Sequence, residues 1–506
     1  MKKGLSTLCI AALVLSLTAC STAQTADTPS QKNTGQDVLS GEIRGEITVS
    51  AYETFRYKNF LEEAAKAFEQ KYPGTKVNIS TFSKMPEVKT SGDDDKKMTI
   101  MTKGDDSQAR VDYINKINTE LMSGRGADVL GIDVLPWYKY AQSGQLEDVS
   151  KYMDTDPAFN LSDYRGNILQ ATRYKDGQYI FPLDYTFNYF AYDSSLFTEE
   201  QQKQLQMDDT FTYENLIGIG ASTYKEVSRN TEKPIKMFGF DERDIFRKLL
   251  QENYKDLIDI EQRKVHINGG KFAKLLESVK EYAEKDYLKP STATGTQITL
   301  DSLQKNKDEQ YFYKVKNNFS LLQHFNKNSR KMAMMDSGQS SSGNEDNDKI
   351  AGLSANSDGK VSFSYNQAYA INSNSANKRT AWEFIKFLAS EEMQTSLQLS
   401  LNGLPINNNA RSEKAKLSVT GELYSAMMSP QENTGGGELT DEQMEIYNKY
   451  IKTVDRFSDL INSFPVTDTT IESMINAEIE NFFNGSKTAD EVADILQSKI
   501  ELYLSE

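Results

Sequence analysis

Short apolar runs alternate with amphipathic stretches along the first third of the chain. Apolar and polar residues alternate in the predicted strands, whereas apolar residues recur at helical spacing in the predicted helices. In order, these segments are a strand at 47–52, a helix at 60–68, a strand at 77–79, a helix at 111–121 and a strand at 128–132. This order predicts a mostly parallel sheet with helices on both faces.

The rest of the chain is predicted to be largely helical, with a few extended segments and loops. Strands are expected at 179–182, 187–192, 331–335 and 363–371, helices over most of 194–328 and at 379–388, and a charged surface loop at 84–107. The tail from Thr440 is predicted to be helical throughout. Two of its sequences have capping-box form, Thr440-Asp441-Glu442-Gln443 and Thr488-Ala489-Asp490-Glu491.

The N-terminus has the pattern of a lipoprotein signal. Lys2 and Lys3 precede an apolar run at 8–17 that is too short to span a bilayer, and Leu17-Thr18-Ala19-Cys20 follows. We expect cleavage before Cys20, a lipid on its thiol, and a polar flexible tether up to residue 43. An ordinary signal peptide with a chance cysteine is the alternative interpretation.

Composition argues against most catalytic and metal chemistry. Cys9 lies in the signal and Cys20 carries the lipid, so the mature body is expected to have no thiol. The two histidines, His266 and His324, have no HExxH-like spacing, and no GxSxG motif occurs. We therefore expect no metal, no cofactor and no enzyme activity. The net charge of −15, or −17 without the two signal lysines, argues against nucleic acid or anionic lipid as the main partner.

Four stretches in order resemble family 1 extracellular solute-binding proteins, the receptors of bacterial carbohydrate importers. They are 127–130 with 140–146, 174–182 with 189–197, 366–394 including Ala381-Trp382-Glu383-Phe384-Ile385-Lys386-Phe387-Leu388, and Gly403-Leu404-Pro405-Ile406. The resemblance spans the chain from about Gly45 to its C-terminus. It implies a two-lobe α/β fold of the periplasmic-binding-protein type (type II), with mostly parallel central sheets and several crossovers between the lobes.

The resemblance also implies a function. An oligosaccharide would bind in the cleft between the lobes, and an ABC transporter permease would receive it from the closed protein. We expect a monomer on the extracellular face of the cell membrane, anchored through the lipid on Cys20. The expected divisions are 1–19 signal peptide, 20–43 lipidated cysteine and tether, 44–184 first lobe, 185–335 second lobe, 336–372 return to the first lobe, and 373–506 a helical remainder mainly of the second lobe.

Candidate ligand-binding residues follow the carboxyl ends of the predicted strands, where open parallel sheets bind ligands. Aromatic faces suit the apolar side of a sugar ring, and carboxylates suit its hydroxyls. The candidates are Tyr52, Glu53, Asp133, Trp137, Asp184, Tyr185, Tyr189, Asp336 and Tyr365. Each has a structural alternative: packing beneath a helix for Trp137, a hinge or sheet-edge role for Asp184 and Tyr185, and a turn-forming role for Asp336.

Other interpretations of the same residues stay open. Trp382 lies at helical spacing with Ile385, which favours a place in the core. Pairs such as Asp133 and Asp184 would suit a surface glycoside hydrolase, and a glycan-binding sensor or adhesin is a further alternative. The acidic runs 93–95 and 344–348 could be solvated loops or a calcium site, although neither has the EF-hand pattern.

Overall fold

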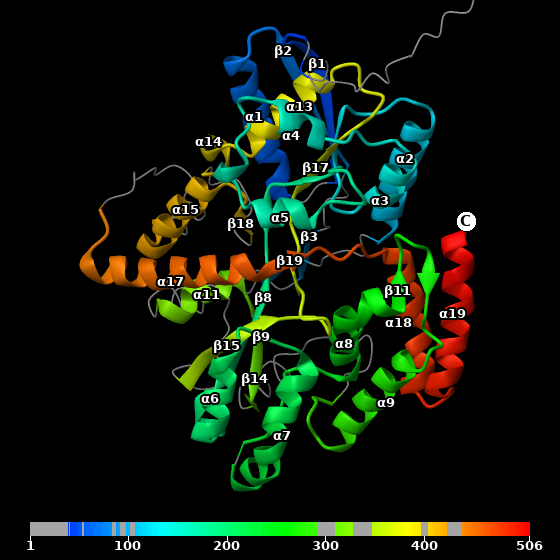
Figure 1. The fold of residues 1–506 in the computed structure, drawn as a ribbon, viewed down its shortest axis with the longest axis vertical. Helices are drawn as coiled ribbons and strands as arrows, with labels where there is room; N and C mark the ends of the chain where they lie inside the picture. Colours follow the sequence, from blue (N-terminus) through cyan, green and yellow to red (C-terminus); the bar gives the residue numbers. More distant parts are fainter. Residues whose placement is uncertain are drawn as a thin grey trace, which may run out of the picture.

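The computed structural model describes residues 39, 41–52, 55–82, 88–91, 98–101, 107–231, 233–290, 309–326, 347–395, 403–422 and 438–505. Figure 1 shows these residues in two sheet-bearing parts, one above the other, with the C-terminus beside the lower part. The signal peptide, Cys20, Glu53, Asp336 and the predicted strand at 331–335 lie outside the described residues. No helix in the described ranges is long and apolar enough to cross a membrane.

The first lobe is built around a five-stranded sheet in the order β2-β1-β5-β17-β6. Its strands are β1 (Gly45–Tyr52), β2 (Thr75–Phe82), β5 (Val129–Gly131), β6 (Phe181–Pro182) and β17 (Ala368–Ile371). Strands β2 and β5 both run parallel to β1, whereas β17 is antiparallel to β5 and β6. Helices α1 (Phe55–Lys71), α2 (Ser107–Met122), α3 (Trp137–Gln142) and α13 (Lys378–Leu388) cover it.

Apolar periodicity explains how α1 is held on this sheet. Phe60, Leu61, Ala64 and Phe68 are all fully buried, as their helical spacing predicts. The Phe68 ring meets that of Phe384 on α13 edge to face, with centroids 5.2 Å apart. Helix α13 therefore belongs to the first lobe, although 373–506 was assigned mainly to the second.

The second lobe is built around a four-stranded sheet in the order β14-β8-β15-β9. Its strands are β8 (Asn188–Asp193), β9 (Thr210–Phe211), β14 (Tyr313–Asn317) and β15 (Asp348–Ser354). Strands β14 and β15 run antiparallel to β8, and β9 runs parallel to β15. The helices of this lobe are α6 (Glu199–Met207), α7 (Tyr213–Asn230), α8 (Glu242–Leu257), α9 (Lys271–Glu284), α18 (Thr469–Phe483) and α19 (Ala489–Ser505). It also contains two separate strand pairs: β10 (Ile235–Lys236) pairs with β13 (Gln310–Tyr311), and β11 (Ile258–Asp259) pairs with β12 (Lys264–Val265).

Three segments cross between the lobes. The first crossover joins β6 to β8, the second joins β15 to β17, and the third joins α17 (Asp441–Leu460) to α18. Strand β7 (Asp184–Tyr185) of the first pairs with β18 (Leu404–Pro405), and Thr186 pairs with Ser364 of the second. Strand β16 (Val361–Ser362) of the second pairs with β19 (Ile461–Ser463) of the third. The crossovers are therefore bonded to one another.

The remaining elements are short or lie between the lobes. They are β3 (Val88–Ser91), β4 (Met98–Met101), α4 (Ser150–Thr155), the 3₁₀ turns 161–163 and 194–196, α5 (Gly166–Ala171), α11 (Asn318–Phe325), α14 (Glu391–Gln394) and α15 (Asn408–Thr420). Figure 1 shows the long helix α17 lying across the molecule between the two sheets.

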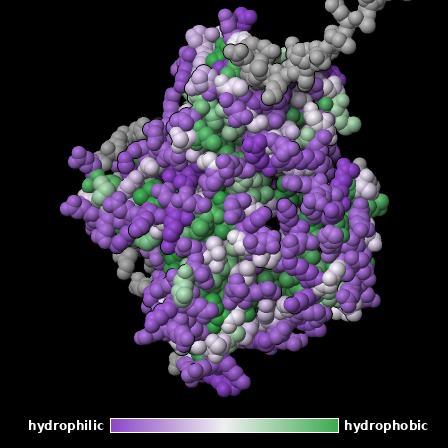
Figure 2. Space-filling model, viewed as in Figure 1, coloured by the Kyte–Doolittle hydropathy of each residue, from purple (hydrophilic) through white to green (hydrophobic). Residues whose placement is uncertain are grey.

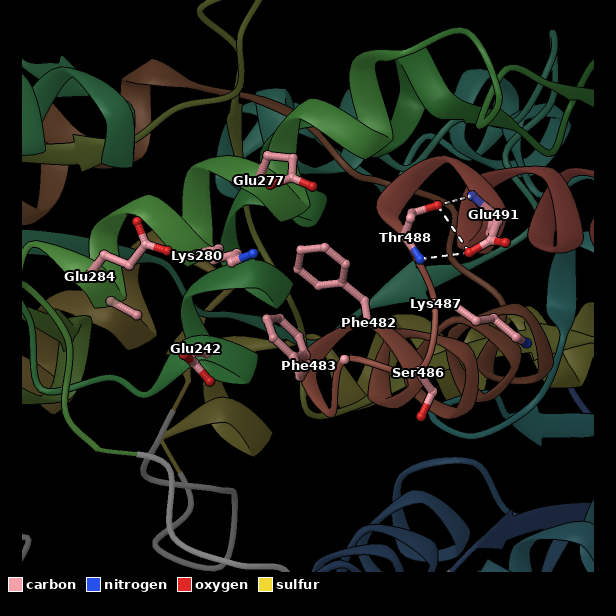
Figure 3. A pocket seen from close by; sticks show the side chains of 12 residues that line it. Glu242, Glu277, Lys280, Glu284, Phe482, Phe483, Ser486, Lys487, Thr488 and Glu491 are labelled. Atoms are coloured by element: carbon pink, nitrogen blue, oxygen red, sulfur yellow. Dashed lines mark hydrogen bonds between the residues drawn. The ribbon is translucent and has the colours of Figure 1, made fainter.

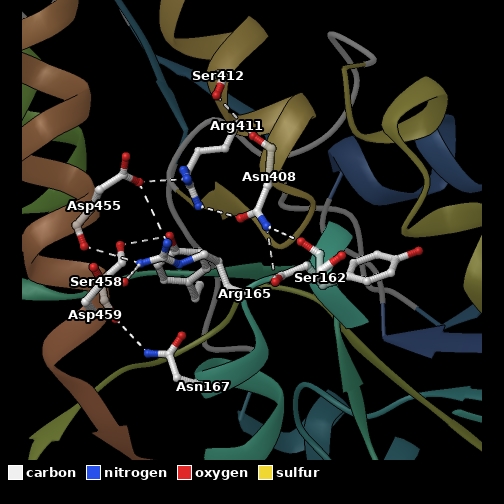
Figure 4. Close-up of polar contacts among 11 residues, drawn as sticks. Ser162, Arg165, Asn167, Asn408, Arg411, Ser412, Asp455, Ser458 and Asp459 are labelled. Atoms are coloured by element: carbon white, nitrogen blue, oxygen red, sulfur yellow. Dashed lines mark hydrogen bonds and ion pairs between the residues drawn. The ribbon is translucent and has the colours of Figure 1, made fainter. Parts of the chain in front are cut away.

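Ion pairs and hydrogen bonds from an asparagine side-chain amide hold α17 against the segments around α5 and α15 (Figure 4). The Arg165 guanidinium donates to Asp459 at 2.7 Å, and Arg411 on α15 donates to Asp455 at 2.7 Å. Asn167 on α5 donates to two backbone carbonyls at the end of α17, at 2.7 and 2.8 Å. The third crossover therefore starts from a helix that is bonded to the segments around α5 and α15.

The structure confirms the two-lobe α/β class and corrects three details. The sheets are mixed, because β17 and β8 enter their sheets from crossovers and pair antiparallel. Residues 88–91 and 98–101 form an antiparallel pair inside the expected loop 84–107. Strand β15 pairs in the second sheet, so the return to the first lobe follows residue 354 and does not begin at residue 336.

Candidate functional site

Asp133 lies at the carboxyl end of β5, where the second crossover reaches the first sheet. Its Oδ1 accepts a hydrogen bond from the backbone N–H of Ala368 at 3.2 Å. Asp133 is exposed at the surface, although neighbouring protein atoms displace part of the water around its carboxyl. This partial desolvation, with the nearby Asp184 carboxylate, raises the pKa of Asp133 above its ordinary range. A partly desolvated carboxyl at a strand end can pair with the hydroxyl of a bound ligand.

Two tyrosines lie within electrostatic reach of this carboxyl. Burial raises the pKa of Tyr365 and of Tyr113, and the charge of Asp133 adds to both shifts. Tyr365 belongs to the second crossover and is partly exposed, whereas Tyr113 on α2 is fully buried. The structure therefore brings together two of the predicted residues, Asp133 and Tyr365.

Aromatic rings from the first lobe and from the second and third crossovers form one cluster, which we call the aromatic cluster. The Phe464 ring stacks on that of Tyr365 with centroids 5.2 Å apart, and lies 5.2 Å from Phe363 and 6.4 Å from Trp137. Trp137 also meets Tyr174 edge to face at 5.6 Å. Trp137 is only 6% exposed, so most of its surface packs against these rings. Trp137 begins α3 and packs on these rings, and its contact with a ligand stays a prediction.

Tyr52 forms a second aromatic group at the carboxyl ends of β1 and β2. Its ring centroid lies 5.6 Å from that of Tyr113 and 6.4 Å from that of Phe82. The guanidinium carbon of Arg110 lies 5.7 Å from the Tyr52 ring centroid. Tyr52 is buried, with its strand end next to α2. This group and Asp133 lie at the carboxyl ends of neighbouring parallel strands, where sheets of this type bind ligands.

Three of the predicted residues lie in the core of the crossover region. Asp184 is fully buried, and its carboxylate accepts the backbone N–H groups of Asn366 (2.7 Å) and Gln367 (3.2 Å) and the Asn366 side-chain amide (2.9 Å). Tyr185 and Tyr189 are also fully buried. The Asp184 carboxylate thus ties the first crossover to the second, whereas the Tyr185 hydroxyl lies 2.9 Å from that of Ser458 on α17. A hinge role for Asp184 and Tyr185 stays a prediction.

Residues that the sequence did not single out also contribute to the aromatic cluster. Phe464 was expected in a continuous helical tail, but it follows β19, where the chain is extended. Pro465 after it was an available signal, because a residue before proline avoids helical geometry. Trp382 behaves as predicted: it is fully buried, and its indole N–H donates to Asp156 at 2.9 Å.

Metal binding has no support among the described residues. No group of three or more histidine, cysteine, aspartate or glutamate side chains there could hold a metal ion. Residues 93–95 lie outside the described part, as do 344–346. Asp348, at the end of the second acidic run, is buried and forms ion pairs with Lys314 (2.7 Å) and Lys316 (3.0 Å). Its charge is therefore satisfied by lysines.

Two surface pockets lie away from the aromatic cluster. One, of about 550 Å³, lies between α9 and the end of α18, with Phe482 and Phe483 pointing into it and Glu277, Lys280 and Glu284 around it (Figure 3). The other, of about 510 Å³, is lined by residues near the start of β1 and of α13. Figure 2 shows a mostly hydrophilic face on which hydrophobic residues appear mainly near the middle.

Comparison with known structures gives the same fold. An extracellular solute-binding protein family 1 from Alicyclobacillus acidocaldarius matches with a TM-score of 0.53 and 13% identity, covering 92% of this chain and 99% of that one. The sugar-binding protein MalE from Xanthomonas citri matches with a TM-score of 0.56 and 13% identity, covering 91% and 98%. An ABC substrate-binding protein from Listeria monocytogenes, solved in complex with cycloalternan, matches with a TM-score of 0.51 and 16% identity, covering 91% and 99%.

Two lobes joined by three bonded crossovers, with aromatic and carboxyl groups at the junction, define a binding protein of the periplasmic-binding-protein type. Residues 105–419 match the bacterial extracellular solute-binding protein family, and the chain belongs to that family. It is thus an extracellular, non-enzymatic solute-binding protein. No curated protein sequence matches it.

Proposed function

We propose that the protein captures an oligosaccharide between its two lobes and delivers it to the permease of an ABC transporter. The ligand would lie against the aromatic cluster and Asp133, because aromatic faces cover the apolar side of sugar rings and carboxyls pair with hydroxyls. Trp137, Tyr365 and Tyr52 are the proposed aromatic contacts. The single observation that carries the proposal is the joining of rings from the first lobe and from two crossovers in one cluster.

The known structures of the same fold add support for the ligand class. One was solved with cycloalternan, and another is named as a sugar-binding protein. Their identity to this chain is low, so they support the general class of a carbohydrate and no particular sugar. The absence of thiols from the proposed mature body and the scarcity of histidines fit a role in binding.

The second part of the proposal is membrane attachment through a lipid on Cys20. The basic, apolar and Leu-Thr-Ala-Cys segments at the N-terminus support it, together with the polar segment that precedes the first strand. Mass spectrometry of the membrane-bound protein should find a diacylglyceryl group on an N-terminal Cys20. A Cys20→Ala variant should lose the lipid and the membrane association, and an unmodified cysteine in the native protein would contradict this part.

Tryptophan fluorescence gives a direct test of the ligand site, because the chain has only Trp137 and Trp382. A panel of malto-oligosaccharides and other glycans is first screened by thermal shift. The best binder is then titrated into the parent, Trp137→Phe and Trp382→Phe. We expect the fluorescence response to persist in Trp382→Phe and to be lost in Trp137→Phe. A full response in Trp137→Phe would reject Trp137 as a contact.

Calorimetry and product analysis test the wider proposal. Binding should release or absorb heat with a saturable profile, and scattering should show a more compact particle with ligand. The sugar recovered afterwards should be uncleaved. If no glycan in the panel bound, the oligosaccharide proposal would be wrong.

A further inference from the structure

Helix α3 of the first lobe meets the second lobe through a polar network. The Tyr138 hydroxyl donates to Oδ2 of Asp468, and the Tyr503 hydroxyl donates to the same oxygen at 3.0 Å. Lys139 Nζ donates to the Tyr503 hydroxyl at 2.7 Å and lies 4.2 Å from the centroid of its ring. Two neighbouring residues of α3 therefore contact the start of α18 and the end of α19.

The Asp468 carboxylate is held in place by the second lobe. Its Oδ1 caps α18 by accepting the backbone N–H groups of Thr470 (2.8 Å) and Ile471 (3.2 Å). The residue is 5% exposed. Oδ1 thus caps the helix, and Oδ2 accepts the hydrogen bond from Tyr138 of the first lobe. A bond from a neutral hydroxyl to a buried carboxylate is stronger than a bond between neutral groups.

Tyr138 stays a hydrogen-bond donor throughout the physiological pH range. Its own burial and the Asp468 carboxylate both raise the pKa of this tyrosine. Helix α3 itself is fixed to the first lobe by Tyr140, whose hydroxyl donates to Asn118 on α2 at 2.6 Å. Tyr138 and Asp468 therefore connect two bodies, each of which is held independently of this bond.

The position of the network makes it sensitive to lobe movement. Asp468 follows the third crossover directly, after Phe464 of the aromatic cluster. A rotation of the second lobe about the crossovers would move Asp468 relative to α3. A bond that is made in only one arrangement of the lobes favours that arrangement over the others.

We propose that Asp468 is a positioning residue that sets the relative placement of the two lobes through Tyr138. The inference rests on the proposed function only in that the lobes are taken to move around a ligand. The alternative is that Asp468 serves solely as the cap of α18. The two differ for Tyr138→Phe, because that change removes the direct bond from α3 to Asp468 and leaves both the cap of α18 and the Lys139–Tyr503 bond intact.

The distance between the lobes can be measured without any ligand. Met122 at the end of α2 and Met207 at the end of α6 are each 81% exposed and lie on different lobes. Both would be replaced by cysteine in a chain whose natural Cys9 and Cys20 are changed to alanine. Spin labels at these positions then report the interlobe distance by pulsed electron paramagnetic resonance.

The parent pair should give one narrow distance distribution. In Tyr138→Phe and Asp468→Asn we expect its mean to shift by more than the parent width, or its width to increase clearly. Tyr224→Phe is the matched control, because its hydroxyl donates to two backbone carbonyls within the second lobe, at 2.8 and 2.6 Å. It should leave the distribution unchanged.

A distribution in Tyr138→Phe that coincides with those of the parent and Tyr224→Phe would overturn the proposal. Oligosaccharide titrations of the same variants separate this inference from the proposed function. A distance shift in a protein that binds no glycan would support the positioning role and reject the proposed ligand. Glycan binding with unchanged distances would support the ligand and reject the positioning role.

Discussion

Replacement of Asp184 by alanine tests whether this buried carboxylate ties two crossovers together. The carboxylate is fully buried and accepts three hydrogen bonds from Asn366 and Gln367, at 2.7 to 3.2 Å. Alanine would leave two backbone N–H groups and the half-buried side-chain amide of Asn366 without their acceptor. Each such group costs about 1–3 kcal/mol, and relief of the buried charge offsets part of the sum.

We therefore expect Asp184→Ala to lower the free energy of unfolding by about 3–5 kcal/mol. Asn366→Ala removes only the amide donor and should cost about 1 kcal/mol. Asp358→Ala is the control, because Asp358 is exposed in the loop after β15 and should change stability by less than about 0.5 kcal/mol.

The assay is urea unfolding followed by both circular dichroism and tryptophan fluorescence. Two probes are needed because two lobes can unfold in separate steps, and coincident transitions allow a single free energy to be used. If Asp184→Ala unfolded at the same urea concentration as Asp358→Ala, the assignment of Asp184 as a buried tie between crossovers would be refuted.

Three further changes have definite expected outcomes. Burial raises the pKa of Glu252 from 4.5 to about 8, so its contribution to stability is present below pH 4.5 and is lost as pH rises through 8. Glu252→Gln should therefore be more stable than the parent above pH 8, on the order of 2 kcal/mol by urea unfolding, and an unchanged pH profile would contradict this. Trp382→Ala should lose about 3–5 kcal/mol because the residue is fully buried, and a loss below about 1 kcal/mol would argue against its core role. Gly403→Ala would place a Cβ 2.2 Å from Oδ2 of Asp184 and should lower the melting temperature, whereas Gly218→Ala, with open space around it, should not.

Local patterns were sufficient for the elements of the first lobe. The spacing of apolar residues predicted β1, α1, β2, α2 and β5, and the structure confirms them. The capping boxes at Thr440 and Thr488 are formed, with reciprocal bonds to Gln443 and Glu491. These features depend on residues a few positions apart, so the sequence displays them directly.

The candidate site could be predicted only in part. The rule of strand ends selected Asp133, and Tyr365 was selected because it flanks a crossover; the structure brings the two into one region. It also selected Tyr185 and Tyr189, which are core residues, because a tyrosine near a strand end looks the same whether its ring packs inward or faces a ligand. Phe464 could not be selected from the sequence, because the rings that it contacts lie far away along the chain.

The sequence by itself determined where the helices and strands of the first third of the chain lie, the capped ends and the scarcity of reactive side chains. Only the tertiary structure decided which strand joins which sheet, so that β15 lies in the second lobe and β17 in the first. It also decided that Asp184 binds the backbone of another crossover and that Asp468 bonds to Tyr138. The physical reason is that strand pairing and buried hydrogen bonds join groups far apart in the chain, whose partners no local pattern records.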